Sequence, residues 1–248
     1  MDDITFLILV RLDSIERLEN ILIVTEYISG LKFPILVLES SSFNNRILIK
    51  LLKKEVQYSF REDYDPILFR TKYLNQMVQS VKTPLIAVWD SDVIVSFDQI
   101  ITAIQLLTNS EADFVIPYKK QALDTTPIIR KLFLEDGKLE TLEQNRKKMK
   151  EMYAPNPLGG AFLANRESYI KAGMENEDFY GWGMEDGERF YRWQRLGYNI
   201  KRVPGPLYHL SHTRGINSTF HNPDQGLWKR KEALKAKRIT GYGRDGIE

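Results

Sequence analysis

The stretch PLIAVWDSD, residues 84–92, decides the fold of this 248-residue chain. Residues 85–89 are all apolar, and the run then ends in Asp90 and Asp92. An unbroken apolar run of this length is typical of a strand that is buried on both faces of a parallel sheet. Because open α/β sheets bind ligands at the carboxyl ends of their strands, the stretch predicts an acidic ligand site at the edge of such a sheet.

The flanking segments alternate between two patterns. Four have the length and composition of strands: TFLILV (5–10), PILVLES (34–40), VQYSF (56–60) and DFVIP (113–117). Four have the spacing of amphipathic helices: 13–30, 44–54, 70–81 and 97–107. We expect Asp13 to cap the first of these helices. The alternation predicts a single-domain α/β fold with a Rossmann-like, mostly parallel central sheet and helices on both faces.

The composition divides the chain into three parts. Residues 1–117 carry the alternating pattern, and residues 118–153 are polar and charge-rich, which predicts an insert or mobile segment. Residues 154–248 are rich in glycine and aromatic residues and end in a basic helix. We expect this last part to form a pocket wall rather than a second packed sheet.

Several classes of function are excluded by composition. The absence of cysteine rules out disulfides, thiolate metal sites and thiol nucleophiles. A net charge of only +2 gives no overall electrostatic case for binding nucleic acid. The start, MDDITFLILV, lacks the positive flank of a signal peptide and is too short to span a bilayer. These features predict a cytoplasmic protein.

Two short motifs suggest a metal site. Asp90 and Asp92 are two residues apart, so in an extended segment both face one ligand, as two carboxylates that bind Mg²⁺ or Mn²⁺ on a diphosphate would. HLSH adds His209 and His212 late in the chain, and a mixed carboxylate and imidazole site favours Mn²⁺. An acidic turn after a strand and histidines used in packing or capping would produce the same motifs.

The stretch GWGMEDGERF, residues 181–190, places three carboxylates beside two glycines and an indole. Glycine allows close approach of the backbone to a ligand, and Trp182 offers a flat face to a sugar ring. Helix capping explains one acidic residue in a first turn, whereas Glu185, Asp186 and Glu188 are three. A carboxylate here is also suited to act as a general base.

These motifs lie in a longer run, residues 156–198, with the sequence NPLGGAFLANRESYIKAGMENEDFYGWGMEDGERFYRWQRLGY. The run resembles the GT-A glycosyltransferases of the group that contains β-1,4-galactosyltransferases, chondroitin polymerase domains and polypeptide N-acetylgalactosaminyltransferases. DSD falls where this group has its D-x-D motif, and HLSH where it has a late metal-binding histidine. The resemblance implies a GT-A fold, a UDP-sugar donor, a glycan acceptor, and Mn²⁺ or Mg²⁺. Residues 1–117 would then bind the donor, and 154–248 the acceptor.

The resemblance also implies roles for single residues. Asp92, His209 and His212 would bind the metal ion. Asp186 would be the general base, and Glu185 would contact the sugars. The implied contacts with the nucleotide sugar are Arg11, Asp13, Glu39, Arg70, Asp90, Gly160 and Trp182. Helix caps or surface charges are the alternative explanation for Arg11, Asp13 and Arg70.

Departures from the group's pattern leave the sugars and the stereochemistry open. Met184 replaces a glycine, and Gly187 interrupts an acidic run. Pro157 and Leu158 replace aromatic residues, which leaves UDP-Gal and UDP-GalNAc both possible as donors. Asp186 favours inversion, although Glu188 stands where retaining members have a second glutamate.

Two other functions fit parts of the sequence: a sugar-binding subunit with a degenerate transferase fold, and a nucleotidyltransferase. The leading hypothesis is a bacterial hexosyltransferase that builds surface polysaccharide, with an acceptor that is a glycan and in many such enzymes is lipid-linked. WKRKEALKAKR, residues 228–238, is either a solvated basic helix or a helix that lies on an anionic membrane surface.

Overall fold

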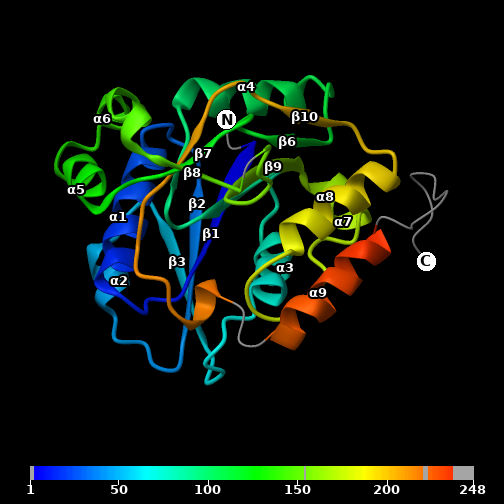
Figure 1. Ribbon diagram of the computed structural model, residues 1–248, viewed down its shortest axis with the longest axis horizontal. Helices are drawn as coiled ribbons and strands as arrows, with labels where there is room; N and C mark the ends of the chain where they lie inside the picture. Colours follow the sequence, from blue (N-terminus) through cyan, green and yellow to red (C-terminus); the bar gives the residue numbers. More distant parts are fainter. Residues whose placement is uncertain (1–2, 154, 220–222, 237–248) are drawn as a thin grey trace.

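A seven-stranded sheet forms the centre of the computed structural model, which describes residues 3–153, 155–219 and 223–236 (Figure 1). Its strand order is β10-β6-β9-β4-β1-β2-β3. The strands are β1 (Ile4–Val10), β2 (Ile35–Ser41), β3 (Gln57–Glu62), β4 (Leu85–Asp90), β6 (Phe114–Ile116), β9 (Ala161–Asn165) and β10 (Ile200–Arg202). β9 runs antiparallel to its neighbours β4 and β6, and the other pairings are parallel, as the alternating pattern predicts.

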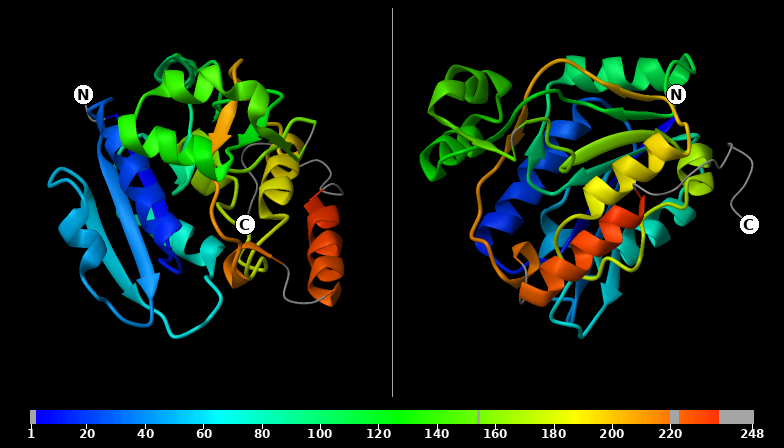
Figure 2. Two further views of the ribbon diagram at one scale, coloured as in Figure 1. Left: turned by 60° about the vertical axis from the view of Figure 1, so that its left-hand side comes forward. Right: turned by 45° about the vertical axis from the view of Figure 1, so that its right-hand side comes forward.

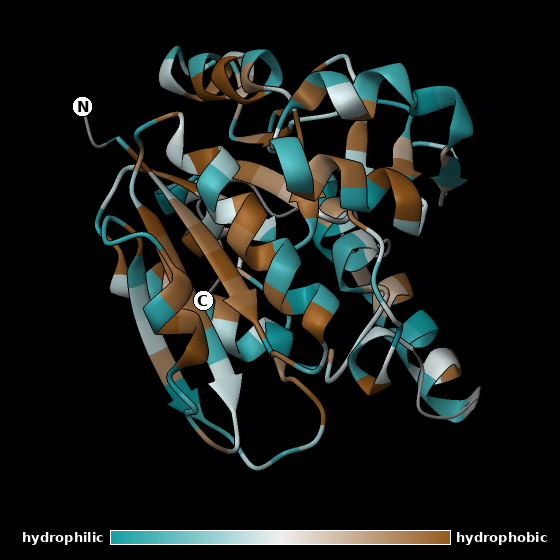
Figure 3. Cartoon of the chain, turned by 90° about the vertical axis from the view of Figure 1, so that its left-hand side faces the viewer, coloured by the Kyte–Doolittle hydropathy of each residue, from teal (hydrophilic) through white to brown (hydrophobic). Residues whose placement is uncertain are grey.

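Helices cover both faces of this sheet because its central strands are apolar on both sides. In β1, Phe6 and Ile8 pack into one core cluster and Leu7 and Leu9 into another. The first cluster includes residues of α1 (Ile15–Ser29), α2 (Ile47–Leu51) and α4 (Phe97–Thr108). The second includes residues of α3 (Arg70–Ser80), α7 (Arg166–Lys171) and α8 (Glu185–Arg195). Figure 3 shows the apolar strands between helices that are polar on their outer sides.

A second, four-stranded sheet lies beside the first, with the order β5-β11-β7-β8. Its strands are β5 (Val93–Ile94), β11 (Leu207–His209), β7 (Ala122–Asp124) and β8 (Lys150–Met152). The late part of the chain, expected to form a pocket wall rather than a second packed sheet, contributes β11 to this sheet, whereas β5, β7 and β8 lie within residues 93–152. Strands of two or three residues are too short to show a periodic pattern in the sequence.

The charge-rich segment 118–153 contributes β7 and β8 to the second sheet. Between these strands lie α5 (Pro127–Asp136), α6 (Leu139–Gln144) and the 3-10 turn η1 (Arg146–Lys148). Phe133 and Leu142 are fully buried in the first core cluster. The segment is thus packed on the domain, and its mobility stays a prediction.

Two local expectations differ from the structure. Ser14, not Asp13, caps α1, because its hydroxyl accepts a hydrogen bond from the amide of Arg17 at 3.2 Å while Asp13 pairs with the Arg17 side chain. A helix was predicted over 44–54, but the structure has only the shorter α2 there. The side chains of Asn44 and Asn45 accept hydrogen bonds from the backbone amides two residues later and form turns instead.

Candidate active site

A cavity of about 520 Å³ lies at the carboxyl ends of β1 and β4, next to the start of α8. This volume is in the range of small-molecule sites in proteins. The cavity is lined by most of the predicted site residues: Arg11, Arg70, Asp90, Asp92, Gly160, Trp182, Glu185, Asp186, His209 and His212. The topology thus brings together the DSD, GWGMED and HLSH motifs, which are far apart in the sequence.

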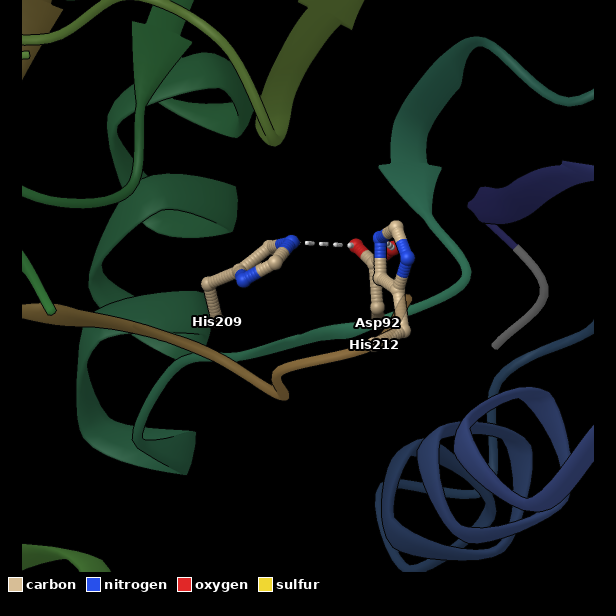
Figure 4. A group of neighbouring side chains, drawn as sticks. All are labelled: Asp92, His209 and His212. Carbon is tan, nitrogen blue, oxygen red and sulfur yellow. Dashed lines mark ion pairs between the residues drawn. The ribbon is translucent and has the colours of Figure 1, made fainter. Parts of the chain in front are cut away.

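Asp92, His209 and His212 form a compact group whose donor atoms all lie within 4.8 Å of one another. Asp92 follows β4, and His209 ends β11 of the second sheet (Figure 4). Nε2 of His209 is 3.7 Å from Oδ1 of Asp92, and Nε2 of His212 is 3.2 Å from Oδ2. Both imidazoles therefore direct their Nε2 atoms at the carboxylate of Asp92.

The other nitrogen of each imidazole is held by an oxygen. Nδ1 of His209 lies 2.8 Å from Oδ1 of Asp124, and Nδ1 of His212 lies 2.8 Å from the carbonyl oxygen of Thr213. Metal-binding histidines usually donate their second N–H in this way, which leaves Nε2 as a free ligand atom. The three residues therefore fit a divalent ion, and a donor set of one carboxylate and two imidazoles suits Mn²⁺ better than Mg²⁺.

The charges in this group support one another. Burial alone would raise the pKa of Asp92, but the charges of His209, His212 and Arg17 outweigh it and hold the pKa below its usual value. Burial lowers the pKa of His209, and the carboxylates of Asp92 and Asp124 more than offset this, so that its pKa is raised. A cation bound between these groups would stabilise the charged form of Asp92, as the charges of His209 and His212 do.

Asp90 lies in the same cavity but faces a different partner. It forms an ion pair with Arg70, the first residue of α3. Burial is the main cause that raises the pKa of Asp90, with the nearby charges of Asp92 and Asp186 adding to it and Arg70 opposing it. Nη1 of Arg70 is buried and has no hydrogen-bond partner among the described residues.

Asp186 stands in the first turn of α8 and lines the same cavity as Asp92, His209 and His212. Its Oδ1 accepts a hydrogen bond from Nη2 of Arg189 at 2.6 Å. Its Oδ2 packs against Gly159, where an added Cβ would lie only 2.4 Å from it. One oxygen is thus fixed by a guanidinium, and the other depends on a residue without a side chain.

Glu185 precedes Asp186 and is only 5% exposed. Its Oε2 has no hydrogen-bond partner in the part of the chain that the structure describes. Burial, together with the charge of Asp186, raises its pKa to about 7, against the opposing effect of Arg70. A carboxyl group with this pKa can donate or accept a hydrogen bond near neutral pH.

Arg11 and Gly160 shape the cavity walls. Arg11 follows β1, and its guanidinium is held by Asp63 at 2.8 Å and by the carbonyl of Ser40 at 3.0 Å. Gly160 has φ of 92°, and a Cβ there would lie 3.0 Å from a methyl group of Leu207. This glycine is therefore required by both its backbone conformation and the second sheet beside it.

Asp13 and Glu39 do not line the cavity formed by the described residues. Asp13 pairs with Nε of Arg17 at 2.8 Å. Glu39 is buried and accepts a hydrogen bond from the Tyr58 hydroxyl at 2.7 Å. Both side chains have partners within the protein, and their contact with a nucleotide stays a prediction.

Sequence reasoning missed four residues that support the site: Arg17, Asp124, Gly159 and Arg189. Arg17 lines the cavity, with Nη1 3.9 Å from Oδ2 of Asp92. Arg189 holds Asp186 and also forms two 2.8 Å hydrogen bonds with Glu175. In the sequence these arginines look like ordinary charges of amphipathic helices, and Asp124 lies in the polar segment. Of these four residues, Gly159 alone could have been recognised from the sequence, because it belongs to the glycine pair 159–160.

Comparisons with known proteins agree with this geometry. A family model described as the N-terminal domain of galactosyltransferase matches residues 141–219, the segment that holds Gly160, Asp186 and both histidines. The catalytic domain of Drosophila β1,4-galactosyltransferase 7, solved with xylobiose, superposes with a TM-score of 0.58 and 19% identity over 100% of this chain and 85% of that one. The chain is a glycosyltransferase with the GT-A fold.

Two further solved structures share the fold of this glycosyltransferase. Glucosyl-3-phosphoglycerate synthase from Mycobacterium tuberculosis, in complex with Mn²⁺, UDP and phosphoglyceric acid, has a TM-score of 0.55 and 17% identity over 97% of this chain and 80% of that chain. GalNAc-T7, with UDP, GalNAc and Mn²⁺, has a TM-score of 0.60 and 14% identity over 92% of this chain and 47% of that chain. A search of curated proteins found no match.

The predicted family resemblance and fold class of this glycosyltransferase are thus confirmed. Its helices, as far as the structure describes them, include none that is long and apolar enough to cross a membrane.

Proposed function

We propose that this glycosyltransferase moves a hexose from a UDP-sugar to a hydroxyl group of a glycan acceptor, with inversion and with Asp186 as the general base. The observation that carries the proposal is that one cavity holds two separate acidic centres. Asp92 stands with two histidines, and Asp186 stands with Glu185 at the start of α8. Stabilising a departing diphosphate and removing a proton require different acids.

The donor side is suited to a diphosphate. A Mn²⁺ ion bound by Asp92, His209 and His212 would act as a Lewis acid that offsets the negative charge on the departing UDP. Arg11, Arg17, Arg70 and Arg214 all line the cavity. Their guanidinium groups can donate hydrogen bonds to phosphate oxygens, for which the planar fork of arginine is well shaped.

Asp186 takes the acceptor's proton in this proposal. The acceptor oxygen forms a bond to the anomeric carbon of the donor while the bond from that carbon to the β-phosphate oxygen breaks. The hydroxyl proton passes to Asp186, and the bonding electron pair leaves with UDP. Glu185 binds a sugar hydroxyl, for which its unpaired buried Oε2 provides the hydrogen-bonding atom.

The surroundings of Glu188 support inversion over retention. Its carboxylate accepts two hydrogen bonds from Arg192, at 2.8 and 3.1 Å, and it lies outside the cavity lining that the described residues form. A second glutamate that faces the anomeric carbon, as the retaining alternative requires, is thus not provided by Glu188.

For the donor sugar we propose galactose or N-acetylgalactosamine. Pro157 and Leu158 line the cavity where a larger aromatic side chain would reduce its volume. The matching family model is described as a galactosyltransferase domain, and the GalNAc-T7 structure contains GalNAc. UDP-Gal and UDP-GalNAc are therefore the first two donors to compare.

We further propose that the protein works in the cytoplasm on a lipid-linked glycan of a bacterial surface polysaccharide. α9 (Pro223–Ala236) exposes Leu227, Trp228 and Leu234 together with basic side chains, a pattern that suits the surface of an anionic membrane. Lys237 and Arg238 of the predicted basic helix lie outside the described residues. We expect co-sedimentation with liposomes of anionic lipid at low salt and less at physiological salt. No binding at either salt would contradict membrane contact.

A screen of UDP-sugars tests the proposed function. With Mn²⁺ present, UDP-Gal or UDP-GalNAc should be hydrolysed slowly, and a panel of acceptor sugars should accelerate UDP release. Mn²⁺ and UDP together should also raise the thermal midpoint, because ligands that bind only the native state stabilise it. Stabilisation without turnover of any UDP-sugar would support a sugar-binding subunit instead. No stabilisation at saturating concentrations would contradict both.

A further inference from the structure

The C-terminal helix α9 lies outside the matched galactosyltransferase segment, yet it packs along α8 (Figure 2). Its inner face carries Lys229, Glu232, Ala233 and Ala236, which are all buried. Gln225 is one turn before Lys229 on the same face. This face meets the backbone of loop 180–184, which connects to the first turn of α8 and so to Glu185 and Asp186.

Two side chains of α9 donate hydrogen bonds to carbonyl groups of this loop. Nζ of Lys229 donates to the carbonyl oxygen of Trp182 at 2.6 Å, and Nε2 of Gln225 donates to that of Tyr180 at 3.3 Å. The two carbonyls flank Gly181. The ring of Trp228 adds a contact 6.3 Å from that of Phe179. The helix therefore contacts the loop at Tyr180 and Trp182 and the preceding residue Phe179.

The loop has a backbone conformation that needs such support. Gly181, Gly183 and Met184 have φ of 73°, 103° and 73°. Positive φ is unfavourable for a residue with a side chain, so Met184 in particular must be held by its surroundings. The loop also places Trp182 and Glu185 in the cavity wall.

Lys229 is unusual because it is a fully buried cation. Burial lowers its pKa, and the nearby charge of Glu185 opposes this effect. Burying an ammonium group is costly unless it gains hydrogen bonds or a nearby opposite charge. At this position it gains the carbonyl of Trp182 and the attraction of Glu185, a residue of the proposed acceptor site.

We propose that Lys229 and Gln225 are positioning residues, which fix loop 180–184 so that Trp182 and Glu185 face the bound sugars. The inference rests on the proposed function for its effect on transfer, but its effect on the loop is independent of activity. The donor side, with Asp92 and the two histidines, is built on other elements. Loss of the α9 contact should therefore reduce transfer without weakening binding of UDP and Mn²⁺.

The test compares Lys229→Met and Gln225→Ala with Lys231→Met, in which an exposed lysine of the same helix is replaced. Hydrogen exchange reports on the loop directly. We expect amides 181–185 to exchange at least about tenfold faster in Lys229→Met, less so in Gln225→Ala, and at the wild-type rate in Lys231→Met. The acceptor KM should rise and kcat should fall by about tenfold or more, whereas the thermal shift produced by Mn²⁺ and UDP should stay unchanged.

Wild-type exchange rates and wild-type kcat in Lys229→Met would overturn the inference. If that variant does not fold, Gln225→Ala decides by the same two measurements, since it removes the weaker hydrogen bond and keeps the buried charge. If the wild type turns over no UDP-sugar, the proposed function fails, but the exchange rates still show whether α9 holds the loop.

Discussion

Single residues carry the strongest claim about the site, because Asp186 depends on a neighbour without a side chain. We predict that Gly159→Ala pushes the Asp186 carboxylate away, since the new Cβ would lie 2.4 Å from its Oδ2. A displacement of this kind should lower kcat by about tenfold to a hundredfold and leave the fold intact, because a side-chain end can move. Steady-state kinetics and the thermal midpoint check both parts.

Gly187→Ala is the matched control for this prediction. An added Cβ at Gly187 meets nothing within 4 Å, and the position lies in α8. This variant should keep its activity and gain up to about 1 kcal/mol of stability from helix propensity. Equal kcat in the two variants would show that Asp186 does not need the space at Gly159.

Glu185 gives a prediction for stability against pH. Its pKa is raised to about 7 in the folded protein from 4.5, so the folded state holds its proton while the unfolded state loses it. Stability from this group is therefore present below pH 4.5 and is lost as pH rises to about 7. Glu185→Gln cannot lose a proton, so this loss of stability is absent in the variant. The free energy of unfolding of the variant minus that of the wild type should therefore increase by on the order of 3 kcal/mol between pH 4.5 and pH 7.

Urea unfolding from pH 4 to pH 8 measures the difference. Glu151→Gln, in which an exposed carboxylate of β8 is replaced, should show no change with pH relative to the wild type. A constant difference between Glu185→Gln and the wild type over the whole range would contradict the raised pKa.

At the scale of single residues, the sequence predicted which side chains line the cavity better than it predicted the residues that hold them in place. Asp92, the histidines and Asp186 follow from motifs at strand ends and at a helix start. Arg17 and Arg189 could not be assigned, because an arginine on an amphipathic helix looks the same whether it faces solvent or a carboxylate. Their partners are set by tertiary packing.

Among the secondary-structure elements, the second sheet has the largest consequence for the site. β11 carries His209 and pairs with β7, which carries Asp124, so the sheet sets the distance between the imidazole and its carboxylate. Asp124→Asn should weaken Mn²⁺ binding by about tenfold to a hundredfold, because the histidine loses the carboxylate charge that makes its Nε2 a stronger ligand. Titration calorimetry with Mn²⁺ in the presence of UDP measures this affinity.

Glu151→Gln serves again as the control, since Glu151 is exposed on β8 of the same sheet. Its Mn²⁺ affinity should equal that of the wild type. An unchanged affinity in Asp124→Asn would mean that Asp124 only packs beside His209.

Long elements were predictable and most short ones were not, although the three-residue strand β6 was predicted at 113–117. The apolar runs of β1, β2 and β4 and the amphipathic pattern of α3 and α4 have enough residues to show their period. β5, β7, β8 and β11 have two or three residues each, and their pairing joins segments distant in the chain. Such pairing is decided by the packing of the whole domain.

For the molecule as a whole, the motifs predicted the fold and the chemistry through their combination. Each motif alone has an ordinary structural explanation, and only the fold shows that all three line one cavity. The role of α9 could not be predicted from the sequence, because Lys229 is one of several cations in the basic run 228–238. Its burial against the loop depends on how α9 docks on α8.

The central claim is that this cavity separates the metal-binding acid from the acid that takes the proton. The most direct test is the rate of transfer from UDP-Gal or UDP-GalNAc by Asp186→Asn, at saturating Mn²⁺ and with UDP affinity measured on the same protein. We predict a rate at least about a hundredfold below that of the wild type, with unchanged UDP affinity. Transfer at the wild-type rate would contradict the claim.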